Sequence, residues 1–132
     1  MKKLILFIST MLFSANINIE VSGIQNSEGA LFVGLFNSAE NFPKKEFAYQ
    51  SVAVHVNSNI LKYQFENIPN GIYSIAIFHD TNSNGILDKN FVGMPTESYG
   101  FSNNARGLFG PPSFDEAKFE LIKNTNIKVE VK

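Results

Sequence analysis

Oxygen-bearing side chains alternate along one short segment, residues 80–88, at a spacing that suits a calcium ion. EF-hand loops bind calcium through positions 1, 3, 5 and 9 and through the carbonyl oxygen at position 7, with a glycine at position 6. The corresponding residues here are Asp80, Asn82, Asn84, Ile86 (carbonyl), Asp88 and, at the turn, Gly85. Position 12, which needs a bidentate glutamate, is Phe91. The spacing therefore predicts a calcium loop on a scaffold other than a helix–loop–helix hand.

Glu97 is the candidate for the missing carboxylate, because Gly93 and Pro95 allow the chain to fold back before it. The alternative for the loop is an Asx-rich turn whose side chains bond to their own backbone. The alternative for Glu97 is an ordinary solvated carboxylate. Transition metals are not favoured, since the donors are oxygens and His79 is the one nitrogen donor nearby in the sequence.

Catalytic pairs are less well indicated than a metal site. Adjacent strand residues point to opposite faces, so we expect His79 to be buried or to anchor a loop instead of pairing with Asp80. Two of the carboxylates near the long segment could pair as in glycoside hydrolases, but their spacing suits metal binding better. These carboxylates are Asp80, Asp88, Glu97 and Asp115.

Aromatic residues gather in residues 85–116, a glycine- and proline-rich segment without sustained periodicity. Structureless segments of this length are uncommon in compact domains, and the aromatic content favours an ordered loop. We expect its aromatic side chains, Tyr99, Phe101, Phe109 and Phe114, to form a small core beneath the loop. The alternative is a binding surface for a sugar or a peptide, formed by Tyr99, Phe101, Phe109 and the only arginine, Arg106, which otherwise ties the loop or stays exposed.

Apolar residues alternate with polar ones over most of the chain after residue 16, which is typical of half-buried strands. The expected strands lie at 17–21, 31–35, 52–56, 60–65, 72–79, 117–122 and 127–131. We expect the first two to pair as a hairpin. Seven short strands with polar turns predict an all-β fold, an antiparallel β-sandwich with one long ordered loop.

The N-terminus has the order of a secretory signal peptide, with two lysines, an apolar run at residues 4–13 and the small residues Ser14 and Ala15. We expect a signal at residues 1–15, a single domain at 16–132, and a secreted or periplasmic product. The apolar run is shorter than the roughly 20 residues that span a bilayer, so no membrane span is expected. The alternative is a buried first strand or helix.

Composition excludes several classes of function. Without residues 1–15 the formal charge falls from −1 to −3, and no basic cluster suits nucleic acid. The chain has no cysteine, so thiol catalysis, disulfides and lipid attachment through cysteine are excluded.

Two motifs resemble known families. Residues 67–73, with Pro69, Gly71 and Tyr73, resemble the turn before a strand in transthyretin-like and carboxypeptidase-regulatory-like sandwiches. Residues 79–88, 93–104 and 110–114 resemble the bacterial family called domain of unknown function 2141. The resemblance implies a small exported sandwich of transthyretin-like or immunoglobulin-like style and brings no catalytic residues.

The expected function is therefore a non-catalytic binding or structural module with a calcium-stabilised loop that contacts a protein or a cell-envelope glycan. The alternative is a calcium-supported hydrolase that acts on an envelope glycan or peptide through Glu97 or Asp115.

Overall fold

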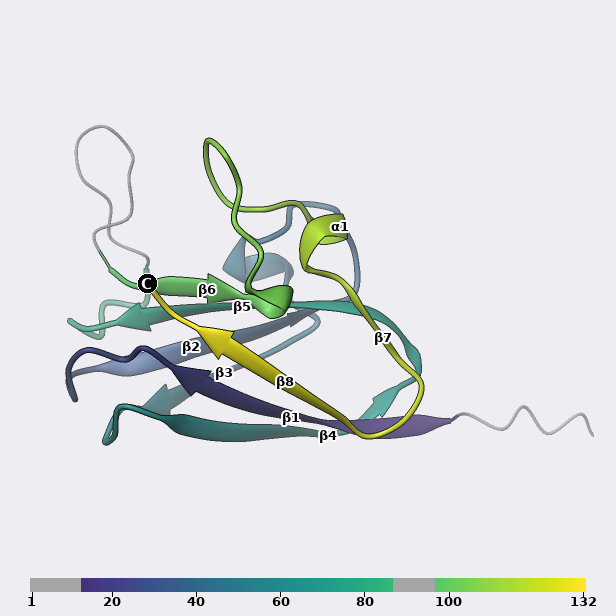
Figure 1. The fold of residues 1–132 in the computed structure, drawn as a ribbon, viewed down its shortest axis with the longest axis horizontal. Helices are drawn as coiled ribbons and strands as arrows, with labels where there is room; N and C mark the ends of the chain where they lie inside the picture. Colours follow the sequence, from purple (N-terminus) through teal and green to yellow (C-terminus); the bar gives the residue numbers. More distant parts are fainter. Residues whose placement is uncertain (1–12, 87–96) are drawn as a thin grey trace, which may run out of the picture.

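A computed structural model of the chain describes residues 13–86 and 97–132. Two β-sheets pack face to face, and short helical segments lie above the upper sheet in Figure 1. The elements in chain order are β1 (Ser14–Ser22), β2 (Ala30–Phe36), the 3-10 helix η1 (Lys45–Phe47), β3 (Gln50–His55), β4 (Leu61–Pro69), β5 (Gly71–Asp80), β6 (Tyr99–Phe101), the 3-10 helix η2 (Ser102–Asn104), α1 (Phe114–Ala117), β7 (Phe119–Leu121) and β8 (Thr125–Glu130). The predicted all-β sandwich is confirmed.

Strands that follow one another along the chain do not always belong to the same sheet. One sheet has the order β4-β1-β8, and the other has the order β3-β2-β5-β6, with β7 paired to the start of β5. All pairs are antiparallel except β1 with β8. The expected hairpin of β1 and β2 is wrong, because the two strands belong to opposite sheets. Each has an apolar face, and both faces turn toward the space between the sheets.

The main core fills this space. The alternation seen in the sequence places the expected side chains inside, with Ile17, Ile19 and Val21 of β1 facing Leu31, Val33 and Leu35 of β2 across one apolar cluster. Burying aliphatic side chains of this size stabilises the fold by about 1.5–3 kcal/mol each.

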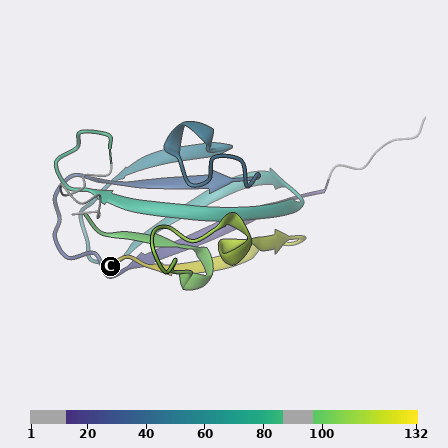
Figure 2. The ribbon, with the colours of Figure 1, turned by 90° about the horizontal axis from the view of Figure 1, so that it is seen from above.

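A second, smaller core covers the outer face of the β2–β5 sheet. It contains Phe36, Ala76, Phe101, Phe114 and Ala117. Figure 2 shows the crossover with η1 and the segment with η2 and α1 on the two sides of β5. Their side chains meet over the sheet, since Phe42 from the crossover lies with its ring centre 5.8 Å from that of Phe114. The long segment is therefore ordered over its described part.

The sandwich is closed on one side by hydrogen bonds. Tyr99 of β6 and Lys132, just beyond β8, exchange backbone bonds of 3.1 and 3.0 Å. On the other side, β3 and β4 each have one partner strand among the described residues. The two sheets of the sandwich are thus joined along one edge, where β6 stands next to the C-terminus.

The turn between β4 and β5 carries the chain from one sheet to the other. Here the Tyr73 hydroxyl donates a hydrogen bond to the carbonyl oxygen of Pro69 at 2.5 Å. Burial, together with the neighbouring Tyr49, raises the pKa of Tyr73 above its usual value. This bond gives the tyrosine of the motif a structural role.

The C-terminal part differs from the sequence prediction in one detail. The expected strand at 117–122 begins with the end of α1 and continues as β7. Ser113 and Glu116 form a capping box at the start of α1, which fixes a helical turn over residues 114–117, so the helix includes Ala117, the first residue of the expected strand.

Candidate functional site

Asp80, the last residue of β5, closes the predicted calcium loop on itself. Its carboxylate accepts hydrogen bonds from the backbone N–H of Asn84 at 3.1 Å and of Gly85 at 2.7 Å. Gly85 adopts a left-handed φ of 80°, which suits the glycine expected at the turn. Asp80 is 6% exposed, and these backbone donors supply hydrogen bonds to its carboxylate in place of water.

The two asparagines bond to the same backbone. Asn82 Oδ1 accepts from Asn84 N at 3.3 Å, and Asn84 Oδ1 accepts from Ile86 N at 3.0 Å. The described part of the loop therefore has the hydrogen bonding of an Asx-rich turn. Within residues 13–86 and 97–132, the Asp80 carboxylate accepts two hydrogen bonds, of the roughly four that a carboxylate can accept.

Glu97 lies at the root of the loop. Its Oε2 accepts bonds from the backbone N–H of Thr81 at 2.7 Å and from the Thr81 hydroxyl at 3.0 Å. Glu97 is 8% exposed, so the solvated alternative for this residue is wrong. The structure thus brings a second carboxylate to the residue next to Asp80.

His79 holds a third segment against this root. Its ring nitrogen Nε2 lies 2.6 Å from the carbonyl oxygen of Glu28, and its backbone N–H donates to Ser98 O at 2.8 Å. At Gly29, with a φ of 66°, any Cβ would overlap with the carbonyl of Asp80. The prediction of a buried, loop-anchoring histidine is confirmed.

Lys45 supplies a positive charge beside the loop. Its ammonium donates to the carbonyl oxygen of Gly85 at 3.1 Å and lies 5.3 Å from the centre of the Phe32 ring. Sequence reasoning missed this residue, because it comes from the η1 crossover, 40 positions before Gly85, and no local pattern marks it.

Asp88 falls outside the described residues, as do Phe91, Gly93 and Pro95. Ile86, expected to offer its carbonyl oxygen, is described, and its side chain is exposed. Over residues 13–86 and 97–132, no three His, Cys, Asp or Glu side chains stand close enough to share a metal ion. The described carboxylates at the loop are Asp80 and Glu97.

The aromatic residues of the long segment separate into core and surface. Phe101 and Phe114 are buried, so Phe101 is not part of an exposed binding surface. Tyr99 is half-buried beneath the Arg106 guanidinium, which lies 5.1 Å from the ring centre. Phe109 is fully exposed, so its expected place in the small core is wrong.

Arg106 also ties the segment to β8, because its Nη2 donates to the carbonyl oxygen of Glu130 at 3.4 Å. Asp115 lies exposed on α1 and pairs with Lys118 at 3.3 Å. A surface pair of this kind adds little to stability.

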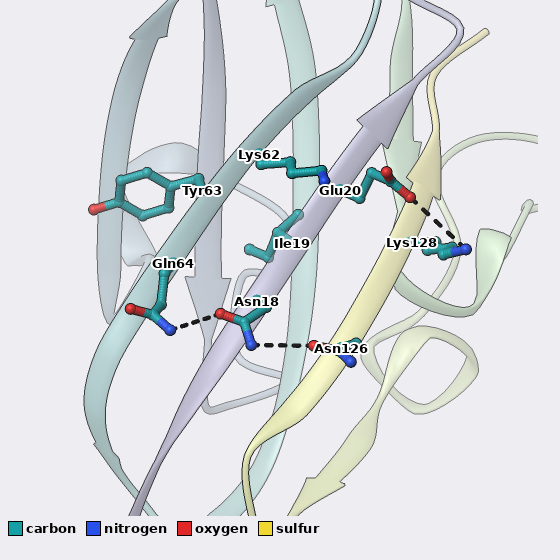
Figure 3. A pocket seen from close by; sticks show the side chains of 8 residues that line it. All are labelled: Asn18, Ile19, Glu20, Lys62, Tyr63, Gln64, Asn126 and Lys128. Atoms are coloured by element: carbon teal, nitrogen blue, oxygen red, sulfur yellow. Dashed lines mark hydrogen bonds and ion pairs between the residues drawn. The ribbon is translucent and has the colours of Figure 1, made fainter.

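A shallow hollow lies on the outer face of the β4-β1-β8 sheet (Figure 3). Asn18 at its centre accepts a bond from Gln64 at 2.7 Å and donates one to Asn126 at 3.1 Å. The one carboxylate among its lining residues, Glu20, lies 3.8 Å from the Lys128 ammonium. The hollow therefore lacks the pair of carboxylates that glycoside hydrolysis requires.

Comparisons with known proteins place the chain in a family. The family described as uncharacterized proteins conserved in bacteria, domain of unknown function 2141, matches residues 19–130. Searches of the curated proteins and of the solved structures gave no match. The match covers both sheets, the loop at Asp80 and α1, so the chain belongs to the domain of unknown function 2141 family.

Proposed function

We propose that this chain is an exported, non-catalytic β-sandwich module that binds a protein or a cell-envelope glycan and whose loop at residues 80–88 is stabilised by calcium. One observation carries the proposal. Asp80 and Glu97, the two carboxylates that are buried among the described residues, both lie at the root of this loop, since Glu97 bonds to Thr81, the residue after Asp80. Burying a charged group is costly, so two such groups at one place require compensation.

Backbone donors supply part of this compensation, and a calcium ion would supply more. The ligands would be the side chains of Asp80, Asn82, Asn84, Asp88 and Glu97 with the carbonyl oxygen of Ile86. An all-oxygen set of this kind suits a hard cation. Bound calcium would neutralise the carboxylates and fix the loop to the edge of the sandwich.

Calorimetric titration of the metal-stripped protein with calcium tests the proposal. We expect the wild type to bind calcium and Asp80→Asn to bind it at least about tenfold more weakly, since a first-position charge is lost. Asp115→Asn is the matched control, because it removes an exposed carboxylate on α1, and it should leave the affinity unchanged. A wild type without binding heat, or an Asp80→Asn variant with unchanged affinity, contradicts the calcium site.

The hydrolase alternative is not favoured by the described residues. Glu97 is buried and bonded to Thr81, and Asp115 is exposed and paired with Lys118. Neither faces the hollow in Figure 3 as a lining residue. An acid–base mechanism needs both groups within reach of one substrate.

Export is tested by the mass of the protein isolated from its native cells. We expect a mature chain cut near Ala15. β1 begins at Ser14 and Ala15 is buried against Ile68, so a cut after Ala15 shortens this strand by two residues. A soluble mature protein that keeps residues 1–13 contradicts export through a cleaved signal.

No helix of the described residues is long and apolar enough to cross a membrane.

A further inference from the structure

The loop between η2 and α1 carries an apolar tip. Residues 107–112 are Gly-Leu-Phe-Gly-Pro-Pro, six successive residues without a polar side chain. Leu108 and Phe109 are 93% and 102% exposed. Figure 1 shows this loop, in green, reaching farther from the sheets than α1 beside it. Two large apolar side chains thus stand at the end of a projection.

The loop is held at both ends. A Cβ at Gly107 would overlap with the carbonyl oxygens of Gly110 and Pro111, so the two arms of the loop touch there. Arg106 fixes the first arm to Glu130, and the capping box at Ser113 fixes the second. These contacts hold the tip in its exposed position. The loop therefore loses little conformational entropy when the tip binds.

We propose that this tip inserts shallowly into the surface of a lipid bilayer. A protein pocket that receives an apolar anchor usually surrounds it with a rim of hydrogen-bonding groups, and residues 107–112 offer no side chain for such a rim. At a bilayer surface, the two apolar side chains can enter the acyl boundary while the backbone of the loop stays in the hydrated headgroup layer, where its N–H and C=O groups keep their hydrogen bonds. A projecting loop also enters a flat surface without a collision between the membrane and the sandwich.

The charges near the tip indicate which membranes suit it. Arg106 stands directly before the apolar residues, and its guanidinium is held over Tyr99 and against Glu130, so a single positive charge lies at the base of the tip. Beyond the tip, Asp115 and Glu116 are acidic, so the region has no basic cluster. Apolar contact therefore dominates, and binding depends weakly on anionic lipid and on salt. This inference is independent of the calcium site.

The chain has no tryptophan, which allows a direct test. Phe109→Trp places the sole tryptophan at the tip, and Ile122→Trp places it at a control position that is 63% exposed beyond β7. Each variant is titrated with phosphatidylcholine vesicles and with phosphatidylethanolamine–phosphatidylglycerol vesicles. We expect the emission at position 109 to shift to shorter wavelength with both kinds of vesicle, and the emission at position 122 to stay unchanged. Adding Leu108→Ser should weaken partitioning at least about tenfold.

Circular dichroism and melting curves confirm that each variant is folded. The proposal is overturned if neither kind of vesicle shifts the emission at position 109. It is also overturned if the emission shifts only with a vesicle-free extract of envelope proteins, because the partner would then be a protein. Equal shifts at positions 109 and 122 also overturn it, because the tip would then have no special role.

Discussion

Glu97 and Thr81 are joined by two hydrogen bonds that share one carboxylate oxygen, Oε2 of Glu97. Because Thr81 directly follows Asp80, these two bonds hold Glu97 against the end of β5, at the edge of the sandwich. Closing the segment between Thr81 and Glu97 costs conformational entropy. Hydrogen bonds to a charged acceptor offset this cost. The relationship makes Glu97 a structural tie whether or not an ion is bound.

Removal of the Glu97 side chain should loosen this tie. We expect Glu97→Ala to cost about 1–3 kcal/mol and to speed hydrogen exchange at Thr81 and residues 98–104, with the core strands unchanged. Glu97→Gln, which keeps an acceptor, should have a smaller effect. Glu120→Ala, on the exposed face of β7, is the control. Equal protection in wild type and Glu97→Ala would show that the tie does not hold the segment.

Lys45 should oppose calcium binding, because its charge lies at the Gly85 carbonyl within the proposed loop. We expect Lys45→Met to lower the calcium Kd by about a few-fold at low salt, with a smaller change at high salt. Lys44→Met removes an exposed neighbouring charge and should have a weaker effect. A Kd that rises in Lys45→Met, or one that changes equally in both variants, contradicts the placement of this ammonium beside the ion.

The Tyr73 hydroxyl should make the free energy of unfolding fall at alkaline pH. Because the pKa of Tyr73 is raised in the folded state, the unfolded chain loses its proton first as the pH rises. The stability from this group is thus complete below pH of about 10 and is lost above it. Tyr73→Phe should destabilise the protein by about 0.5–1.5 kcal/mol at neutral pH, since the hydrogen bond to the exposed Pro69 is lost.

Urea unfolding at pH values from 7 to about 11 checks this prediction. The free energy of unfolding of the wild type should fall more steeply above pH of about 10 than that of Tyr73→Phe. Parallel curves for the two proteins would remove Tyr73 as the cause.

Ser102 should be a strong stabilising contact. Its fully buried hydroxyl donates to the carbonyl of Ala117 at 2.5 Å and accepts from the backbone N–H of Ile75 at 2.9 Å. It thereby joins η2, the end of α1 and β5. We expect Ser102→Ala to cost about 1–3 kcal/mol in denaturant unfolding, because a buried donor is left without its partner. Ser58→Ala, in the turn before β4, is the control, and equal losses in both variants would contradict the prediction.

Sequence reasoning succeeded where the signal is local. Alternation identified the buried faces of β1 and β2, because the side chains of a strand alternate regardless of its partners. The same pattern could not assign β1 and β2 to opposite sheets, since an apolar face fits a hairpin or a sandwich equally well. Glycine spacing likewise identified the turn at Gly85.

Long-range contacts decided the remaining features. Phe101 and Phe109 have the same side chain, but Phe101 has the crossover residue Phe42 packed against it at 6.1 Å between ring centres. Phe109 lies at the end of a projecting loop and is exposed. Contacts such as that of Lys45 with Gly85 join distant parts of the chain and leave no periodic trace in the sequence.

The melting temperature of the metal-stripped mature protein, with and without calcium, tests the central claim most directly. At free calcium of about 100 times Kd, binding adds about 2.7 kcal/mol, which raises the melting temperature by about 10 °C for a domain of this size. Asp80→Ala should melt at the same temperature under both conditions. If the wild type melts at the same temperature in calcium and in chelator, the loop is not stabilised by calcium. The segment at Asp80 would then be an Asx-rich turn without an ion.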